Sequence, residues 1–585
     1  MNLSSFMREW PSWILVPQRN IIVPEYARRQ EGHPADIWVG CALGDEGKWK
    51  IGDTLWGHAV RFNGGHNAGH TLMVNGVTYD FHIVPSSIVD PTKMAIIART
   101  CVVGLELPKA RKDEESGWKK FDTSKSGDIV CNHKLDDMYA RMSDRSIQKV
   151  WVFPELEQVR SKHIDPNGRL FISKNATLIG VHHILLDALS EEIRERLSVP
   201  KIGSTGSGIA PAYGKTHTII EHAITHGQWV LPEYRELAQN LKSLNEQRWY
   251  SSILFALQRP NTYMSFVEAE WAIMKKYFPN ISFDEIKKEQ YRQIALLRQA
   301  KEQCKIIIGD EKEKIRQLIR ENGRIIGEWA QSLLIGDAHS VYGTTSNPDV
   351  TTFCEATGIR EDEIGNIFLV MKLPPSSVGT RPIDFMRYPE SSLLERLRQD
   401  YREFGVSTGR PRDIVQISLV ETARAVELLL AWTGSPDTLR DRIVPVLNRA
   451  DGLRDFAELT GGQIPIVTGY THHVWGETHV GLYEDAIDRT RSVTTITPKN
   501  LLTNYPDRNM LGHPDMFKTS SDKVIKRMVG WDLSVNTDRM WAGVGYVTEY
   551  VLAAIFGNDV PRDVILGTWP KRGDLVVVRK MTPSR

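Results

Sequence analysis

The sequence has few cysteines, and their spacing excludes two common uses of that residue. Five occur among 585 residues, and no two of them form a CxxC pair: Cys41, Cys101, Cys131, Cys304 and Cys354. An odd number of scattered cysteines argues against a disulfide framework and against a zinc site. The pattern is typical of reduced thiols, so we expect a cytoplasmic protein.

The sequence also lacks an excess of either charge and lacks long apolar runs. It contains 73 Lys and Arg against 72 Asp and Glu, a net charge of +1, which gives no sign of a nucleic-acid or membrane-surface partner. The apolar segment 13–16 lies between Pro11 and Pro17 and is too short for a signal-peptide core or a membrane span. No other segment approaches 18 apolar residues. We expect a soluble protein.

No internal repeat is present, and short apolar runs alternate with helical patterns from Asp36 onward. This alternation predicts an α/β fold with a large mixed or parallel central sheet flanked by helices. The length would allow several domains. We predict an N-terminal extension (1–34), a catalytic domain (35–540) and a C-terminal extension (541–585).

The expected elements are given by residue range. Strands are predicted at 37–43, 59–62, 150–153, 367–371, 464–468 and 574–578, because these runs are apolar and rich in β-branched residues. A long helical region is predicted at 283–331, broken at Gly309 and Gly323, and a further helix at 547–556. The charged stretch 109–127 is predicted to be a solvated insertion loop.

The most informative motif is a glycine-punctuated turn directly after the apolar run 37–43. It reads GDEGKWK (44–50) and is followed by GGHNAGH (64–70). Such a turn between a strand and a helix can offer backbone amides to an anion, although the Walker A pattern GxxxxGK[ST] is absent. An ordinary strand–helix turn explains the same residues when they are taken alone. His66 and His70 have a spacing that suits a metal on a helix, but the neighbouring glycines argue against a helix and therefore against zinc.

Three further motifs have the chemistry of anion binding. The loop GSTGSG (203–208) alternates glycines with hydroxyls, which suits phosphate oxygens. The segment STGRPR (407–412) places two guanidinium groups on a proline-stiffened turn, which suits a carboxylate or a phosphate. NRAD (448–451) is similar to the NKxD element that binds guanine. Each motif alone is also compatible with a surface turn.

The order of these motifs resembles that of the adenylosuccinate synthetase family. GDEGKWK and GGHNAGH are similar to the family's GDEGKGK and GGHNAGHT, and HIVPS (82–86) is similar to HLIPS. GSTGSGIAPAY (203–213), EWAQ…TTSN (328–347), STGRPR and NRAD continue the match in the family's order. The seven motifs span residues 44–451, with insertions within 89–200 and 214–327.

The resemblance implies a ligase that joins L-aspartate to C6 of IMP in purine biosynthesis, with GTP and Mg²⁺. The 6-oxygen of the purine is phosphorylated first, and the aspartate amine then displaces phosphate. Asp45 would accept the N1 proton and bind Mg²⁺ together with the carbonyl of Gly69. His70 would donate a hydrogen bond to the 6-oxygen, and Gln331 is a further catalytic candidate.

The resemblance also assigns binding residues to small-molecule substrates, in a protein expected to be a homodimer. Those for the nucleotide substrate are Asn67, Thr205, Gln331 and Thr344. Those for aspartate are Ser407, Thr408, Arg410 and Arg412. Those for the nucleoside triphosphate are Glu46, Gly47, Lys48, Arg449 and Asp451.

Several positions depart from the family pattern. Trp49 replaces a glycine of the phosphate turn, and Ser207 and Ser377 each replace an arginine. No RRGLR-like segment follows Tyr213, Arg449 replaces a lysine, and VNTDR (535–539) is only loosely similar to the family's STGPDR. These departures concern the identity of the bound nucleotides more than the fold.

Three hypotheses follow from these residues. The first is the IMP:aspartate ligase with GTP, favoured by Asp45, His70, Gln331 and the STGRPR loop. The second is a relative of the viral enzymes that use dGMP and take ATP or GTP, favoured by the altered phosphate turn and opposed by the retained Asp45. The third is a nucleotide-binding pseudoenzyme, favoured by Trp49 and the missing arginines.

Overall fold

The computed structural model describes residues 13–15, 32–44, 46–48, 57–74, 77–105, 118–120, 129–132, 134–135, 152–199, 201–226, 232–245, 251–336, 346–377, 387–404, 411–474, 477–480, 524–530, 547–548, 551–556, 563–567 and 575–580. The strands are β1 Trp13–Leu15, β2 Ala35–Gly40, β3 His58–Arg61, β4 His70–Val74, β5 Val77–Phe81, β6 Ala95–Ile97, β7 Val102–Val103, β8 Trp118–Lys120, β9 Ile129–Cys131, β10 Leu170–Ser173, β11 Thr177–Leu178, β12 Ile307–Gly309, β13 Ile325–Ser332, β14 Ile364–Lys372, β15 Ser376–Ser377, β16 Asp413–Ile414, β17 Ile417–Ser418, β18 Ile443–Asn448, β19 Gln463–Val474, β20 Glu477–Val480, β21 Val524–Gly530, β22 Asp563–Gly567 and β23 Leu575–Lys580. The helices are α5 Val152–Ser161, α6 Val181–Arg196, α7 Ile209–Ala212, α8 Thr216–His226, α9 Pro232–Asn245, α10 Ile253–Gln258, α11 Pro260–Met274, α12 Phe283–Gln303, α13 Glu311–Arg320, α14 Val350–Thr357, α15 Ser392–Asp400, α16 Leu419–Leu430, α17 Pro436–Asp441 and α18 Leu453–Ala457.

A large central sheet organises the fold. Its order is β1-β23-β22-β18-β14-β2-β13-β3-β6-β10-β12, and the nine strands from β22 to β12 are parallel to one another. At one edge of the described sheet, β23 runs antiparallel to β22, and β1 runs antiparallel to β23 and so points the same way as the nine parallel strands. A parallel sheet needs apolar cover on both faces, and β2, β14 and β18 are buried along their whole length. The predicted α/β fold with a large, mostly parallel sheet is confirmed.

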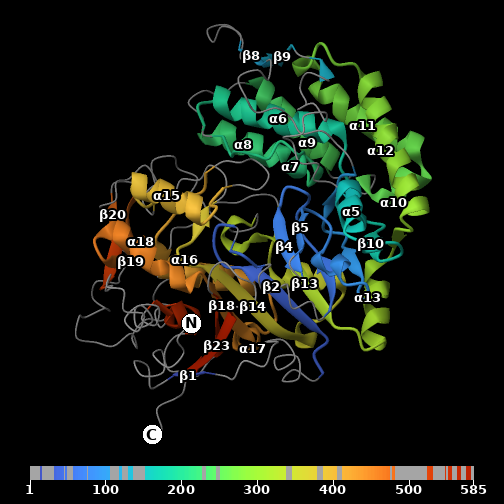
Figure 1. The fold of residues 1–585 in the computed structure, drawn as a ribbon. Coiled ribbons are helices and arrows are strands. Elements are labelled where there is room, and N and C mark those ends of the chain that lie inside the picture. Colours follow the sequence, from blue (N-terminus) through green and yellow to red (C-terminus); the bar gives the residue numbers. More distant parts are fainter. Residues whose placement is uncertain are drawn as a thin grey trace.

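The helices form separate groups around this sheet. Figure 1 shows α6, α8, α9, α11 and α12 gathered together, apart from α15, α16 and α18. The first group packs in an apolar cluster that includes Ile184, Leu237 and Leu297. Another cluster joins β2 and β14 to α14 and α16 through residues such as Val39, Phe353 and Val426. No helix in the described part of the chain has both the length and the low polarity that a membrane span requires.

Most predicted strands are confirmed with shifted ends, but the strand predicted at 150–153 is wrong. Helix α5 begins at Val152, and its buried apolar side chains follow helical spacing at Val152, Leu156 and Val159. Glu155, also buried, accepts hydrogen bonds from the amides of the segment 82–84. The apolar run 150–153 overlaps the first turn of an amphipathic helix, which a window of four residues cannot distinguish from a strand.

The helical region predicted at 283–331 is only partly correct. It contains α12 and α13, but also the sheet strands β12 and β13. The two helices have clear start signals, a capping box between Ser282 and Glu285 and the Asp310 cap of α13. The strands coincide with pairs of β-branched residues, at 307–308 and 325–326, which favour extended backbone. The interruption near Gly323 is confirmed, since α13 ends at Arg320, whereas α12 already ends at Gln303 and Gly309 belongs to β12.

Both chain ends contribute to the central sheet. Strand β1 pairs with β23, and β22 pairs with β18. The C-terminal helix predicted at 547–556 is confirmed for residues 547–548 and 551–556, and β23 confirms the strand near 575. Of the predicted loop 109–127, the described part is strand β8, which pairs with β9; the rest lies outside the described residues. The proposed domain boundaries stay predictions.

Candidate functional site

Most of the described candidate residues follow the carboxyl ends of central strands. The segments after β2, β3 and β18 contain Lys48, Asn67 and Arg449, and Gln331 lies near the carboxyl end of β13. Since these strands are parallel neighbours in one sheet, their carboxyl ends lie along the same edge. Ligands of open α/β sheets bind at this edge.

The turn after β2 is organised by the buried carboxylate of Glu46. Its Oε1 accepts hydrogen bonds from the backbone amides of Ala42 (3.2 Å) and Gly44 (2.9 Å). Its Oε2 pairs with Lys48 Nζ at 3.1 Å, and the Ser332 hydroxyl also donates to the carboxylate. The side chain of Glu46 therefore points into the protein and holds the turn closed.

The charge on Glu46 is stabilised by its surroundings. Burial by itself favours the neutral acid, but Lys48, the Ser332 hydroxyl and the backbone amides outweigh it and lower the pKa of Glu46. The carboxylate lies directly over Gly40, at the end of β2, where a Cβ would overlap Glu46 and Ser332. Glycine at position 40 is what allows this close approach.

Lys48 connects the turn to the end of β13. Its ammonium donates to the backbone carbonyl of Gln331 at 3.3 Å as well as to Glu46. Asn448, the last residue of β18, donates from Nδ2 to the carbonyls of Glu46 (2.7 Å) and Gly47 (3.1 Å). The structure thus brings Glu46, Gly47, Lys48 and Gln331 together.

His70 is buried and electrically neutral. It begins β4 opposite Phe81 of β5, with the two ring centroids 5.6 Å apart, and it is 2% exposed. Burial, together with the positive charges of Arg61 and Lys48, places the pKa of His70 well below its ordinary value. A neutral imidazole keeps one N–H donor and one acceptor nitrogen.

The glycine-rich segment before His70 is held by hydrogen bonds rather than by a helix. The Gly64 amide donates to the hydroxyl of Tyr213 at 2.8 Å, and that hydroxyl donates to the Thr100 carbonyl at 2.6 Å. The Gly65 amide donates to Asn67 Oδ1 at 3.3 Å. Residues 66–70 form a turn and the start of β4, so the expectation that His66 and His70 do not share a helix is confirmed.

Several backbone amides of the loop 203–208 already donate to acceptors within the protein. The Gly208 amide donates to Asp187 at 2.9 Å and the Gly203 amide to Glu191 at 3.1 Å, both on α6. The Gly206 amide donates to the Ser204 hydroxyl at 3.0 Å. These three donors therefore shape the loop around Thr205, which is partly exposed.

A cluster of charged side chains lies beside β14 and β18. Glu403, Lys372, Arg412 and Arg449 are all buried, and Glu403 forms ion pairs with each of the three cations. Arg449 has a left-handed backbone (φ 60°). Two of these cations, Arg412 and Arg449, belong to the motifs assigned to aspartate and to the nucleotide base.

Several residues that position the site were not predicted from the sequence. Glu403, Lys372, Ser332, Asn448 and Tyr213 were not candidates. Tyr213 and Asn448 are part of quoted motifs, so their position next to assigned residues was a usable signal. The contacts of Glu403 join residues up to 46 positions apart, and no local pattern indicates them.

Five site candidates lie outside the described residues: Asp45, Thr344, Ser407, Thr408 and Arg410. Asp451 is described only by its backbone, in the 3₁₀ turn Ala450–Gly452. Of the two predicted metal ligands, Gly69 is described and Asp45 is not.

One other group of described side chains has the composition of a metal site. His182 and His183 of α6 and Glu270 of α11 are buried together, with His182 Nε2 3.0 Å and His183 Nε2 3.9 Å from Glu270 Oε2. The Gly180 amide donates to His183 Nδ1 at 2.9 Å, which leaves the proton of the neutral ring on Nε2. That tautomer cannot bind a metal through Nε2, so the group fits a structural hydrogen-bond network better than a metal site.

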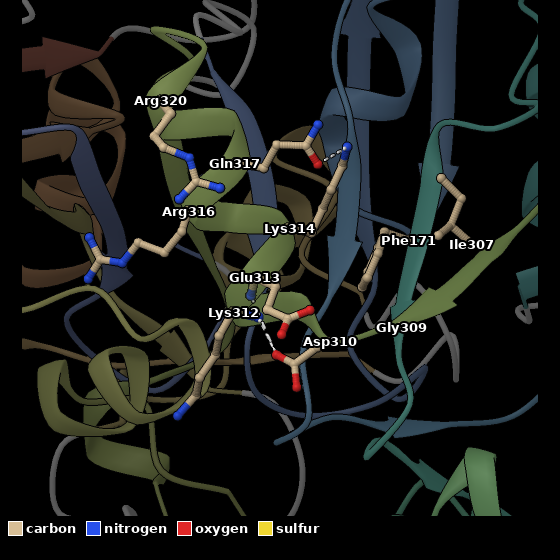
Figure 2. Close-up of a pocket in the computed structure, with 10 residues that line it drawn as sticks. All are labelled: Phe171, Ile307, Gly309, Asp310, Lys312, Glu313, Lys314, Arg316, Gln317 and Arg320. Atoms are coloured by element: carbon tan, nitrogen blue, oxygen red, sulfur yellow. Dashed lines mark hydrogen bonds between the residues drawn. The ribbon is translucent and has the colours of Figure 1, made fainter.

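A groove of about 800 Å³ lies between the edge strand β12 and helix α13. Figure 2 shows Arg316 extending to one side of α13 and Lys314 with Gln317 to the other. Arg316 is paired with Glu363 and Lys314 donates to Gln317 at 3.3 Å. These cations do not converge on one point, and β12 lies four positions from β13 in the sheet. The groove is therefore separate from the candidate site.

Comparison with known proteins identifies relatives over most of the chain. A family model described as adenylosuccinate synthetase matches residues 37–123 and 145–431. The adenylosuccinate synthetase of Schizosaccharomyces japonicus is 28% identical over 392 residues, covering 66% of this chain and 70% of that protein. That of Halothermothrix orenii is 26% identical over 432 residues, covering 73% and 80%.

A solved structure confirms the fold. The fully ligated adenylosuccinate synthetase of Plasmodium falciparum is similar with a TM-score of 0.58 and 16% identity, covering 93% of this chain and 99% of that one. The residues matched by the family model include the turns at 44–50, 64–70, 203–208 and 407–412, but end before the turn 448–451.

Proposed function

This chain belongs to the adenylosuccinate synthetase family, and we propose that it joins L-aspartate to C6 of IMP with GTP as the phosphoryl donor, in purine biosynthesis. The observation that carries this proposal is the match of the family model across the motif-bearing turns. The arrangement of Glu46, Lys48 and Gln331 beside a neutral, buried His70 supports it.

In the first chemical step, the purine 6-oxygen attacks the γ-phosphorus of GTP and GDP leaves. Asp45 accepts the proton that N1 loses. His70 donates its N–H to the 6-oxygen, and its neutral state suits a hydrogen-bond donor that must not give up its proton completely. Lys48 and the amides of the turn orient the phosphates, and Gly47 adopts the left-handed backbone (φ +73°) that a glycine accommodates without strain.

In the second step, the aspartate amine attacks C6 and inorganic phosphate leaves. Arg410 and Arg412, with Ser407 and Thr408, hold the two carboxylates of aspartate, for which the fork of a guanidinium group is suited. Asn67, Thr205, Gln331 and Thr344 hold the nucleotide substrate. Arg449 and Asp451 lie where the family binds the base of GTP.

The candidate metal ligands fit magnesium. The carbonyl of Gly69 and the carboxylate of Asp45 are oxygen donors, which Mg²⁺ prefers. The ion would supply positive charge that neutralises the phosphate oxygens. We also infer from the family a cytoplasmic homodimer; sedimentation of the purified protein measures its oligomeric state.

The function is tested by a matrix of substrates. Purified protein is incubated with aspartate and Mg²⁺ together with IMP or dGMP and with GTP or ATP, and phosphate release and the succinylated nucleotide are measured. We expect turnover with IMP and GTP. A preference for dGMP would favour the viral-type reaction, whereas nucleotide binding without ligation in any combination would favour the pseudoenzyme.

Two variants make this experiment specific. Asp45→Ala should abolish ligation while nucleotide binding persists, because it removes the acceptor of the N1 proton. Asp362→Ala removes a carboxylate just before the amino end of β14. The candidate site lies at the carboxyl ends of the strands, so this variant should leave turnover unchanged. Ligation that survives Asp45→Ala would refute the assigned mechanism.

A further inference from the structure

Glu403 is a buried carboxylate in contact with cations from three separate segments. Lys372 Nζ lies 3.0 Å from its Oε2 and Arg412 Nη1 lies 3.4 Å from the same oxygen, while Arg449 pairs with its Oε1. The Ser376 hydroxyl also donates to Oε2, at 3.1 Å. Glu403 is 1% exposed, so these contacts form away from bulk water.

The three cations share this carboxylate as an ion-pair partner. Side-chain exposure is 4% for Lys372, 7% for Arg412 and 10% for Arg449. Buried charges of the same sign repel one another strongly because little water screens them. Burial favours the neutral acid, but the three cations outweigh it and lower the pKa of Glu403 to about 2. The carboxylate is therefore charged at neutral pH.

The position of Glu403 links it to the loop assigned to aspartate. The Arg412 amide donates to the Glu403 carbonyl at 2.9 Å, and Phe404 forms an antiparallel bridge with Pro411. These contacts hold Glu403 and Phe404 beside Pro411 and Arg412. Side chain and backbone of Glu403 thus both hold Arg412, the described arginine of the STGRPR motif.

The same carboxylate is linked to the turn assigned to the nucleotide base. Lys372 ends β14 and lies opposite Asn448, the last residue of β18, and Arg449 follows directly. The guanidinium of Arg449 also donates to the Tyr401 carbonyl at 2.8 Å and lies 5.0 Å from the centre of the Tyr401 ring. The conformation of the turn 448–451 therefore depends on Glu403, which also contacts Arg412 of the STGRPR motif.

We propose that Glu403 is a positioning residue that couples the aspartate site to the nucleoside triphosphate site through Arg412 and Arg449. Its contacts hold Arg412 and the turn 448–451 in one arrangement, so a change at either is transmitted to the other. The proposal rests on the proposed function, which assigns these two arginines to the two sites.

The first test is the steady-state kinetics of Glu403→Gln, which removes the charge and keeps the shape. The KM for aspartate and the KM for GTP should both rise, by roughly 5- to 150-fold, the range of typical site–site coupling. The KM for IMP should stay unchanged, and kcat should change less than either KM. Glu403→Asp, which restores the charge, should recover part of both effects.

Asp36→Asn is the matched control. Asp36 is also 1% exposed and paired with an arginine, Arg324, at 2.6 Å. It lies near the amino end of β2, whereas the candidate site lies at the carboxyl ends of the strands. This variant should lower stability and leave all three KM values unchanged. If it raised the KM values for aspartate and GTP as Glu403→Gln does, general loosening would explain both and the proposal would be wrong.

A second variant keeps the proposal testable if Glu403→Gln does not fold. Arg449→Lys retains the charge but loses the fork that contacts both Glu403 and Tyr401. If Glu403 couples the two sites, this variant raises the KM for aspartate. If the sites are independent, only the KM for GTP changes, and that result would overturn the proposal.

Failure of the proposed function is seen separately, as absence of turnover by the unsubstituted protein. The coupling is then measured by calorimetric titration with GTP in the presence and absence of aspartate. Glu403→Gln should abolish the dependence of one affinity on the other ligand, and affinities that are independent in the unsubstituted protein would refute the coupling.

Discussion

We predict that the charge on the Glu46 carboxylate stabilises the turn after β2. We consider the substitution Glu46→Gln, which preserves the volume of the side chain and removes its charge. Lys48, 8% exposed at its side chain, would then be a buried cation without its carboxylate partner. The amide oxygen of Gln can still accept a hydrogen bond, so the loss concerns mainly the ion pair and the charge on the acceptor.

The expected cost follows from the burial of the pair. Removing one partner of a buried ion pair costs about 3–5 kcal/mol, because the other charge remains buried. With an unfolding entropy of about 2.1 cal/mol/K per residue, a chain of 585 residues should lose about 2–4 °C of melting temperature. The KM for GTP should rise as well, since Lys48 is assigned to the phosphates.

Differential scanning calorimetry of a double-mutant cycle separates the pair from general damage. Glu46→Gln and Lys48→Met are measured singly and together. Removing both charges should recover much of the melting temperature lost in Glu46→Gln, because no unpaired charge remains. A melting temperature unchanged in Glu46→Gln, or single losses that simply add in the double variant, would refute the assignment of Glu46 as the partner that holds Lys48.

Three further predictions concern neighbouring groups. Because the pKa of His70 lies well below its ordinary value, kcat/KM should show no His70 titration near pH 6.5; Arg61→Met should raise that pKa, as measured by NMR. Tyr213→Phe leaves the Gly64 amide without its acceptor and should cost about 1–3 kcal/mol of stability, visible in thermal unfolding. The lowered pKa of Glu403, about 2 against an ordinary value of 4.5, stabilises the protein at neutral pH. That contribution, on the order of 3 kcal/mol, is present above pH 4.5 and lost as the pH falls towards 2. Acid titration of Glu403→Gln should therefore show a flatter loss of stability over this range.

The fold could be predicted in outline because the strands are short apolar runs with local signals. The strands β2, β3 and β14 are buried on both faces, and their apolar residues are contiguous in the sequence. The predictions of secondary structure were wrong where the same short run of residues is compatible with both a helix and a strand. Residues 150–153 overlap the start of α5, and β12 and β13 lie among helices; only pairing with a neighbouring strand distinguishes such segments.

The sequence by itself determined the family and the order of the anion-binding turns, because those motifs are contiguous and each residue type has a local chemical reason. The tertiary structure decided which groups meet. Glu46 pairs with a lysine two residues away but also with Ser332, 286 positions later, and Glu403 gathers cations from three segments. The charge state of His70 likewise depends on burial and on Arg61. Burial and distance between remote residues set these properties, and a linear sequence contains neither until the chain has folded.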